Sequence, residues 1–112
     1  MTEARLPAHL EVAALIRATE AAGGFATVIA KGERDAGVIL ILTIERGGNA
    51  RLWERMPRLD GRRIFEVVRE QEPDNKEEFS QYLARRTARD RDLWLVELEV
   101  ANAERFVAEI AR

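Results

Sequence analysis

Three side chains of alternating type, Arg51, Trp53 and Arg55, have the spacing in this sequence that best suits ligand chemistry. In the strand expected here, alternate side chains point to one face of the sheet, so an aromatic ring would lie between two guanidinium groups. Such a group can stack on a base and bind an anion. Arg62 and Arg63 follow a turn and complete the candidate ligand-binding residues, for which a small anion or nucleic acid is the ligand class.

The charged residues around these arginines form two blocks along the chain. Residues 46–69 hold seven arginines against three acidic residues, a net charge of +4, and residues 70–78 hold five acidic residues against one lysine, a net charge of −4. Charge runs of this kind are usually solvated or paired. Pairing of the two blocks, within one molecule or across a dimer, is therefore favoured over a ligand site.

Several groups that carry common enzyme chemistry are missing from the sequence. His9 is the single histidine, Ser80 is the single serine, and there is no cysteine. These counts exclude a histidine-based metal cluster, a histidine-assisted nucleophile and a catalytic thiolate. The sequence therefore predicts no catalytic residue of these types, no metal site and no cofactor. Catalysis by paired carboxylates alone stays open as an alternative. The sequence has three such pairs: Glu33 with Asp35, Asp90 with Asp92, and Glu97 with Glu99.

Size and composition predict one globular domain spanning residues 1–112. The chain is 46% hydrophobic and 34% charged, with a net charge of −2 that favours neither nucleic acid nor an anionic membrane as partner. The sequence offers no cleavable signal pattern and no apolar run near the ~20 residues of a membrane span. We therefore expect a cytoplasmic protein.

The segment Gly37–Glu45 is the one around which the fold is expected to form. Its alternation puts Val38, Leu40, Leu42 and Ile44 on one face of a strand, with Ile39 and Ile41 on the other. A strand that is apolar on both faces belongs in the middle of a sheet covered on two sides, or in one whose second face is buried by a partner.

The remaining segments predict an α+β fold, with an antiparallel sheet of about five strands and two to three helices packed on it. Short turns suggest that the first three strands form a meander. Residues 64–69 suit a helix or a strand, and their β-branched and aromatic content favours a strand. Helices are expected over 7–22, after a capping box at Asp74 and Glu77, and after Asn102; strands are expected over 25–30, 37–45, 50–56, 64–69 and 93–100. The expected core includes Val38, Leu40, Leu42, Trp94, Val96 and Leu98.

Four short segments together resemble a family of short, uncharacterised proteobacterial proteins classed as a domain of unknown function. The segments are Val12-Ala13-Ala14, Gly24-Phe25-Ala26, Asp35-Ala36-Gly37-Val38-Ile39 and Asp92-Leu93-Trp94-Leu95-Val96-Glu97. The resemblance covers most of the chain and implies a single-domain cytoplasmic protein. It implies no activity, cofactor or site residue.

Self-association is expected from the apolar second face of the central strand. Ile39 and Ile41, with Val28 or Ile29 beside them, would be only partly covered by the three predicted helices. A symmetric dimer would bury the remainder and let the basic block meet the acidic block of its mate. In the competing arrangement, the first and last helices take opposite faces and seal the sheet. The predicted function is a non-enzymatic interaction module, a homodimer or bound to another protein; the alternative is a binder of small anions or nucleic acid.

Overall fold

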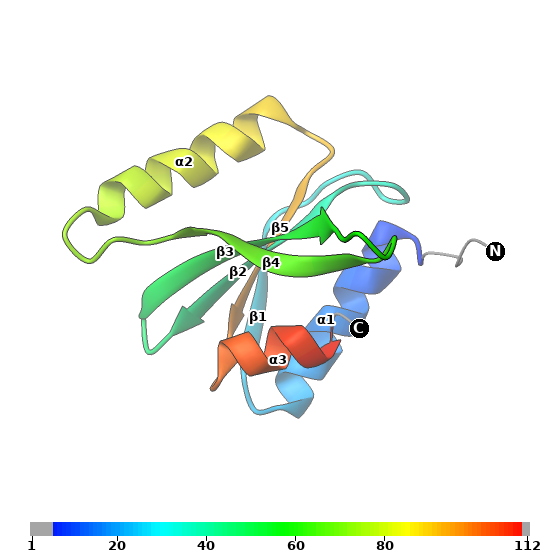
Figure 1. Cartoon of the computed structure of the whole chain (residues 1–112), viewed down its shortest axis with the longest axis horizontal. Helices are drawn as coiled ribbons and strands as arrows, with labels where there is room; N and C mark the ends of the chain where they lie inside the picture. Colours follow the sequence, from blue (N-terminus) through cyan, green and yellow to red (C-terminus); the bar gives the residue numbers. More distant parts are fainter. Residues whose placement is uncertain (1–5, 111–112) are drawn as a thin grey trace.

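The computed structural model describes residues 6–110, which form three helices and five strands (Figure 1). In chain order these are α1 (Ala8–Ala21), β1 (Phe25–Ala30), β2 (Ile39–Glu45), β3 (Gly48–Pro57), β4 (Arg63–Glu70), α2 (Lys76–Arg89), β5 (Trp94–Glu99) and α3 (Ala103–Ile110). The α+β class is confirmed, and the 64–69 segment is a strand. No helix within residues 6–110 is long and apolar enough to cross a membrane.

The five strands form one sheet in the order β1-β5-β2-β3-β4, with β2 at its centre as predicted. Strand β2 runs parallel to β5, and every other neighbouring pair is antiparallel. The predicted meander of the first three strands is correct for the β2–β3 pair, and β4 continues it on the far side of β3. It is wrong for β1, which pairs with β5 and lies at the edge, because the last strand of the chain inserts between β1 and β2.

The loop from β1 to β2 crosses the start of β5 at very close range. The backbone N–H of Glu33 donates to the carbonyl oxygen of Asp92 at 2.9 Å. A Cβ atom at Gly32 or at Gly37 would lie only 2.2 Å or 2.3 Å from that same oxygen. Because glycine has no Cβ atom, Gly32 and Gly37 let the loop cross the start of β5 in close contact. This crossing allows β5 to lie between β1 and β2 in the sheet.

Both faces of the sheet are covered by helices. In Figure 1, α2 lies on one side of the sheet, with α1 and α3 on the other. The first core, under α1 and α3, contains Ala8, Val12, Leu15, Ile39, Ile41, Trp53, Phe65, Trp94, Val96, Leu98 and Val107. The second core, under α2, contains Leu40, Leu42, Ala50, Leu52, Phe79, Leu93 and Leu95.

These positions confirm most of the predicted core and correct three expectations. Leu40, Leu42, Trp94, Val96 and Leu98 are buried, but Val38 is 50% exposed because it precedes the first residue of β2. Ile39 and Ile41 do not form an open face, since α1 and α3 cover them together while α2 covers the opposite face. The competing arrangement, in which the first and last helices take opposite faces, is wrong for the same reason.

The helix starts differ in detail from the predicted caps. The side chain of Asn75 accepts from the backbone N–H of Glu78, so the cap of α2 lies one residue after the predicted Asp74. At α3, the backbone N–H of Ala103 donates to the carboxylate of Glu45 on β2 at 3.3 Å. A side chain remote in sequence therefore binds one of the first N–H groups of α3.

Candidate functional site

Strand β3 places Arg51, Trp53 and Arg55 on one face of the sheet, as the alternation predicts. That face is the one covered by α1 and α3. The Trp53 side chain is only 5% exposed and packs in the first core, and its indole N–H donates to the Thr43 hydroxyl at 2.8 Å. The ring is thus a packed core side chain whose polar group is already bound, with little surface for a stacked base.

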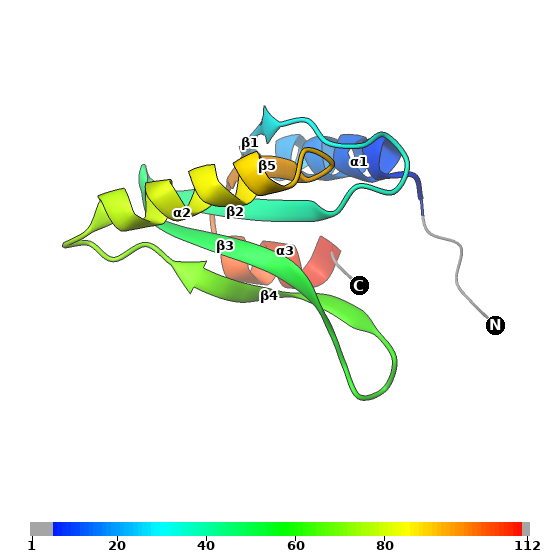
Figure 2. The same cartoon turned by 90° about the horizontal axis from the view of Figure 1, so that it is seen from above.

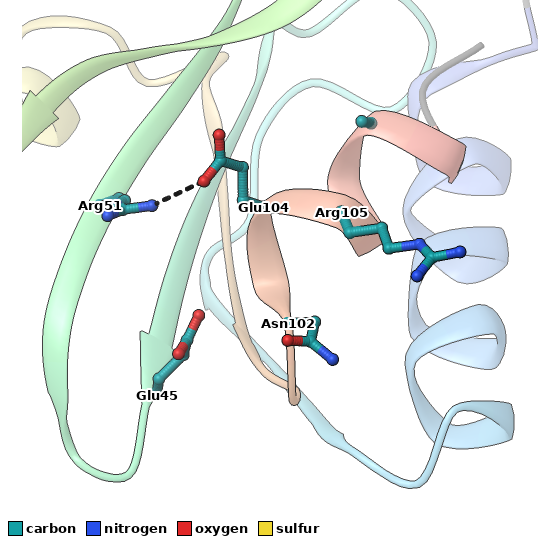
Figure 3. A pocket seen from close by; sticks show the side chains of 6 residues that line it. Glu45, Arg51, Asn102, Glu104 and Arg105 are labelled. Carbon is teal, nitrogen blue, oxygen red and sulfur yellow. Dashed lines mark hydrogen bonds and ion pairs between the residues drawn. The ribbon is translucent and has the colours of Figure 1, made fainter.

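Arg51 lies at one end of this row and is held by two carboxylates. Its Nε lies 3.1 Å from Glu70 on β4, and one of its Nη atoms lies 3.5 Å from Glu104 on α3. Figure 3 shows Arg51 and Glu104 facing each other, with Arg105 pointing away from Arg51. The two guanidinium groups therefore do not converge on one ligand position.

Arg55 lies at the other end of the row and binds the Glu11 carboxylate of α1. One of its Nη atoms donates to Glu11 Oε2 at 3.2 Å, and the other contacts Oε1. Its guanidinium also lies over the Phe65 ring, 4.7 Å from the ring centre. The Arg55–Glu11 ion pair is half-buried and joins α1 to β3, so Arg55 has a structural role.

Two shallow hollows border these two arginines. The α3 hollow has a volume of about 610 Å³ and is lined by Glu45, Arg51, Asn102, Glu104, Arg105 and Ala108. The α1 hollow has a volume of about 310 Å³, and its lining includes Arg55, Glu11 and Asp35. The carboxylates equal the guanidinium groups in number in the α3 hollow and outnumber them in the α1 hollow, so neither has a positive lining.

Arg62 and Arg63 lie on a separate part of the molecule, at the β3–β4 hairpin. Figure 2 shows that this hairpin extends beyond the rest of the sheet. Arg62 donates its backbone N–H and its Nε to the Asp60 carboxylate, at 3.0 Å and 2.8 Å, and these hydrogen bonds lower the pKa of Asp60. Arg63 is exposed at the start of β4. The five candidate residues thus do not form one site, and ligand binding by them stays a prediction.

The basic and acidic blocks are joined within one molecule at two places. Arg51 pairs with Glu70, and Arg69 lies 3.8 Å from Glu78 of α2. Arg69 also covers the Tyr82 ring at 3.8 Å, which ties the strand β4 to α2. Intramolecular pairing, one of the two alternatives left open by the sequence, therefore accounts for part of both blocks.

The remaining chemical groups lie in structural positions. Among residues 6–110, no three His, Cys, Asp or Glu side chains are grouped so that they could hold a metal ion. The Glu33 carboxylate accepts the backbone N–H groups of Asp35 and Ala36, and Asp90 accepts the N–H of Asp92. Two of the three carboxylate pairs therefore form turns.

One surface feature was missed from the sequence, namely the free edge of β1. Among residues 6–110 this strand has β5 as its one neighbour, and Phe25, Ile29 and Val28 are 74%, 52% and 38% exposed. Its sequence, FATVIA, contains no charged residue, whereas the opposite edge strand, β4, carries Arg63, Glu66, Arg69 and Glu70. The absence of charge in the segment was the available signal, but only the strand order shows that it forms an edge.

Residues 6–108 match the family described as "Protein of unknown function (DUF1491)". The chain belongs to this family. A crystal structure of a DUF1491 family protein from Caulobacter crescentus CB15 is 36% identical to this chain, covers 91% of it and 94% of that protein, and superposes with a TM-score of 0.76. The resemblance drawn from the four short segments is thereby confirmed.

Two further solved structures agree with this assignment. The solution structure of protein Atu0922 from A. tumefaciens is 32% identical, with 94% of each chain covered and a TM-score of 0.73. An NMR structure of a DUF1491 family protein from Caulobacter crescentus CB15 is 37% identical, with 94% of each chain covered and a TM-score of 0.72. None of the curated proteins compared with the chain matches it. The family gives the fold and no specific function.

Proposed function

We propose that this protein is a non-enzymatic interaction module of the cytoplasm that associates with itself through the β1 edge. The observation that carries the proposal is the exposure of Phe25, Val28 and Ile29 on an uncharged edge strand. Natural proteins usually protect an edge strand with charges, proline or a covering element, because its free backbone groups can pair with another strand. Strand β4 has such charges and β1 does not.

The apolar side chains favour association in addition to the free backbone groups. Burying a large apolar side chain is worth about 1.5–3 kcal/mol when the burial is complete. In a symmetric contact each of these side chains is buried twice, once in each copy, so its contribution is doubled. The cysteine-free sequence suits a reducing compartment, where no disulfide could stabilise the fold or the assembly.

Sedimentation velocity at micromolar concentration tests this function. We expect a species of about twice the 12.7 kDa chain mass for the wild-type protein, and a monomer for Ile29→Lys. Leu59→Lys is the matched control, because Leu59 is a fully exposed aliphatic residue at the tip of the β3–β4 hairpin. A wild-type protein that stays near 12.7 kDa on concentration would contradict the proposal.

Binding of a small anion or of nucleic acid is the second candidate, and the α3 hollow beside Arg51 is the place where such a ligand would bind. A thermal-shift measurement with inorganic phosphate, nucleotides and a short oligonucleotide distinguishes it from the first. A rise in melting temperature that is lost in Arg51→Ala would support ligand binding. No rise with any of them, together with a dimer in sedimentation, would support the interaction module.

A further inference from the structure

We infer that β1 pairs antiparallel with β1 of a second copy, across a twofold axis at Thr27, so that two sheets join into one of ten strands. This inference rests on the proposed self-association and specifies its geometry. Strand β1 is bound on one side by β5, and its other side is the free edge of the sheet. Figure 2 shows β1 and β4 at the two opposite sides of the sheet. Pairing through β1 therefore leaves the β3–β4 hairpin of each copy uncovered.

A second β1 strand fits this edge better than β4 of another copy. Pairing of β1 with β4 would be head-to-tail, leave one edge free at each end, and generate an open chain of molecules. It would also set the uncharged β1 against a strand with four charged side chains. Pairing of β1 with β1 of a second copy gives a closed assembly of two molecules. It places no like charges opposite each other, because the strand is uncharged.

The arrangement of side chains in β1 restricts the register of the pair. Ala26 packs against the first core and Val28 pairs with Val96 of that core, so both point to the α1 face. A twofold axis perpendicular to the sheet keeps each face on its own side, so directly opposed residues must share a face. The axis must then pass through a residue position and not between two residues.

Among these positions, Thr27 gives the best set of opposed side chains. It places Thr27 against Thr27, Ala26 against Val28, and Phe25 against Ile29 of the partner copy. The two most exposed apolar side chains of the strand thereby cover each other. The register with β5 shifts between Val28 and Ala30, at Ile29. An axis at Val28 would extend the pairing through this irregularity to Ala30, whereas an axis at Thr27 ends it at Ile29. An axis at Ala26 would leave Ile29 beyond the paired segment.

The charges next to the strand are complementary in this arrangement. Lys31 follows β1 directly, and antiparallel pairing brings it towards the Phe25 end of the partner strand. There Glu99 of β5 lies opposite Phe25 in the ladder. Within residues 6–110 neither Lys31 nor Glu99 has an ion pair of its own. Within residues 6–110, each copy thus offers Lys31 beyond one end of β1, and Glu99 on the neighbouring strand β5 at the other end.

The cysteine-free chain allows a direct test with single cysteines. Directly opposed residues of antiparallel strands have Cβ atoms about 4.5–5.5 Å apart, close enough for a disulfide after a small shift. In oxidised glutathione, we expect Thr27→Cys to form a covalent dimer at least ten times faster than Ser80→Cys. Ser80 is exposed on α2, and Val68→Cys on β4 is a second control at the opposite edge.

The register is tested by mixing two further variants. Phe25→Cys and Ile29→Cys should cross-link to each other in the mixture faster than either cross-links to itself. A dimer in sedimentation whose Thr27→Cys variant oxidises no faster than Ser80→Cys would overturn the β1 pairing and the β1 edge as the contact, and would leave self-association through another surface. A protein that is monomeric throughout would overturn both.

Discussion

The indole N–H of Trp53 donates to the hydroxyl of Thr43 across the β2–β3 pair at 2.8 Å, and both side chains are buried. Thr43 would otherwise leave a hydroxyl unsatisfied inside the first core, and Trp53 would leave its N–H unsatisfied. Trp53 pairs with Ile41 in the ladder and Thr43 lies two residues further on β2, so the bond is a diagonal one across the face. Alternate residues of β3 thus place Trp53 in the core and the two arginines, Arg51 and Arg55, at the ends of the same row.

We therefore expect Trp53→Phe to destabilise the protein by about 1–3 kcal/mol, because the buried Thr43 hydroxyl loses its partner and a cavity remains. Thr43→Val should cost a similar amount, since it leaves the indole N–H unpaired. The double variant should cost less than the sum of the two, because neither unpaired group then remains. Urea unfolding followed by circular dichroism measures all three, and strictly additive losses would contradict the coupling.

A second prediction compares two neighbouring apolar residues with different surroundings. Leu40→Ala should lower the free energy of unfolding by about 2–5 kcal/mol, because Leu40 is fully buried in the second core. Val38→Ala should lower it by less than about 0.5 kcal/mol, because half of that side chain is exposed. The same urea titration measures both. A loss at Leu40 under about 1 kcal/mol would place that side chain outside the core.

A third prediction concerns the loop that separates β1 from β2. Gly37→Ala should destabilise the protein by about 1–3 kcal/mol or more, because its Cβ would lie 2.3 Å from the Asp92 carbonyl oxygen. Gly48→Ala is the matched control, since a Cβ there meets nothing within 4 Å. Thermal unfolding of both variants gives the comparison. Equal melting temperatures would mean that the loop moves away from β5 at little cost.

Much of the fold was predictable because its signals are local. Alternation identified the faces of β2 and β5, and β-branched and aromatic residues identified 64–69 as a strand. The place of β1 was not predictable in this way. Its partner, β5, lies more than sixty residues later in the chain, and a parallel crossover between β2 and β5 leaves no turn signal that could predict it.

The candidate site was predictable in placement but not in environment. Alternation put Arg51, Trp53 and Arg55 on one face, but it could not tell whether helices would cover that face. Nor could it supply the partners Glu11 and Glu104, which come from the first and last helices. An aromatic residue between two arginines has the same spacing whether its ring is packed or open, so long-range contacts alone distinguish the two.

A fourth prediction uses the charges at the ends of β1. Lys31→Glu should weaken the dimer several-fold, because a carboxylate would then approach the partner's Glu99, one strand in from the shared edge, and repel it. Lys31 and Glu99 are both exposed, so neither variant should disturb folding. Adding Glu99→Lys to Lys31→Glu restores opposite charges and should return the affinity towards that of the wild type.

Sedimentation at low and high salt measures the effect, which should shrink as salt screens the charges. If Lys31→Glu and the charge-swapped double variant have the same dimer affinity, these two side chains do not approach each other and the antiparallel β1 geometry is wrong.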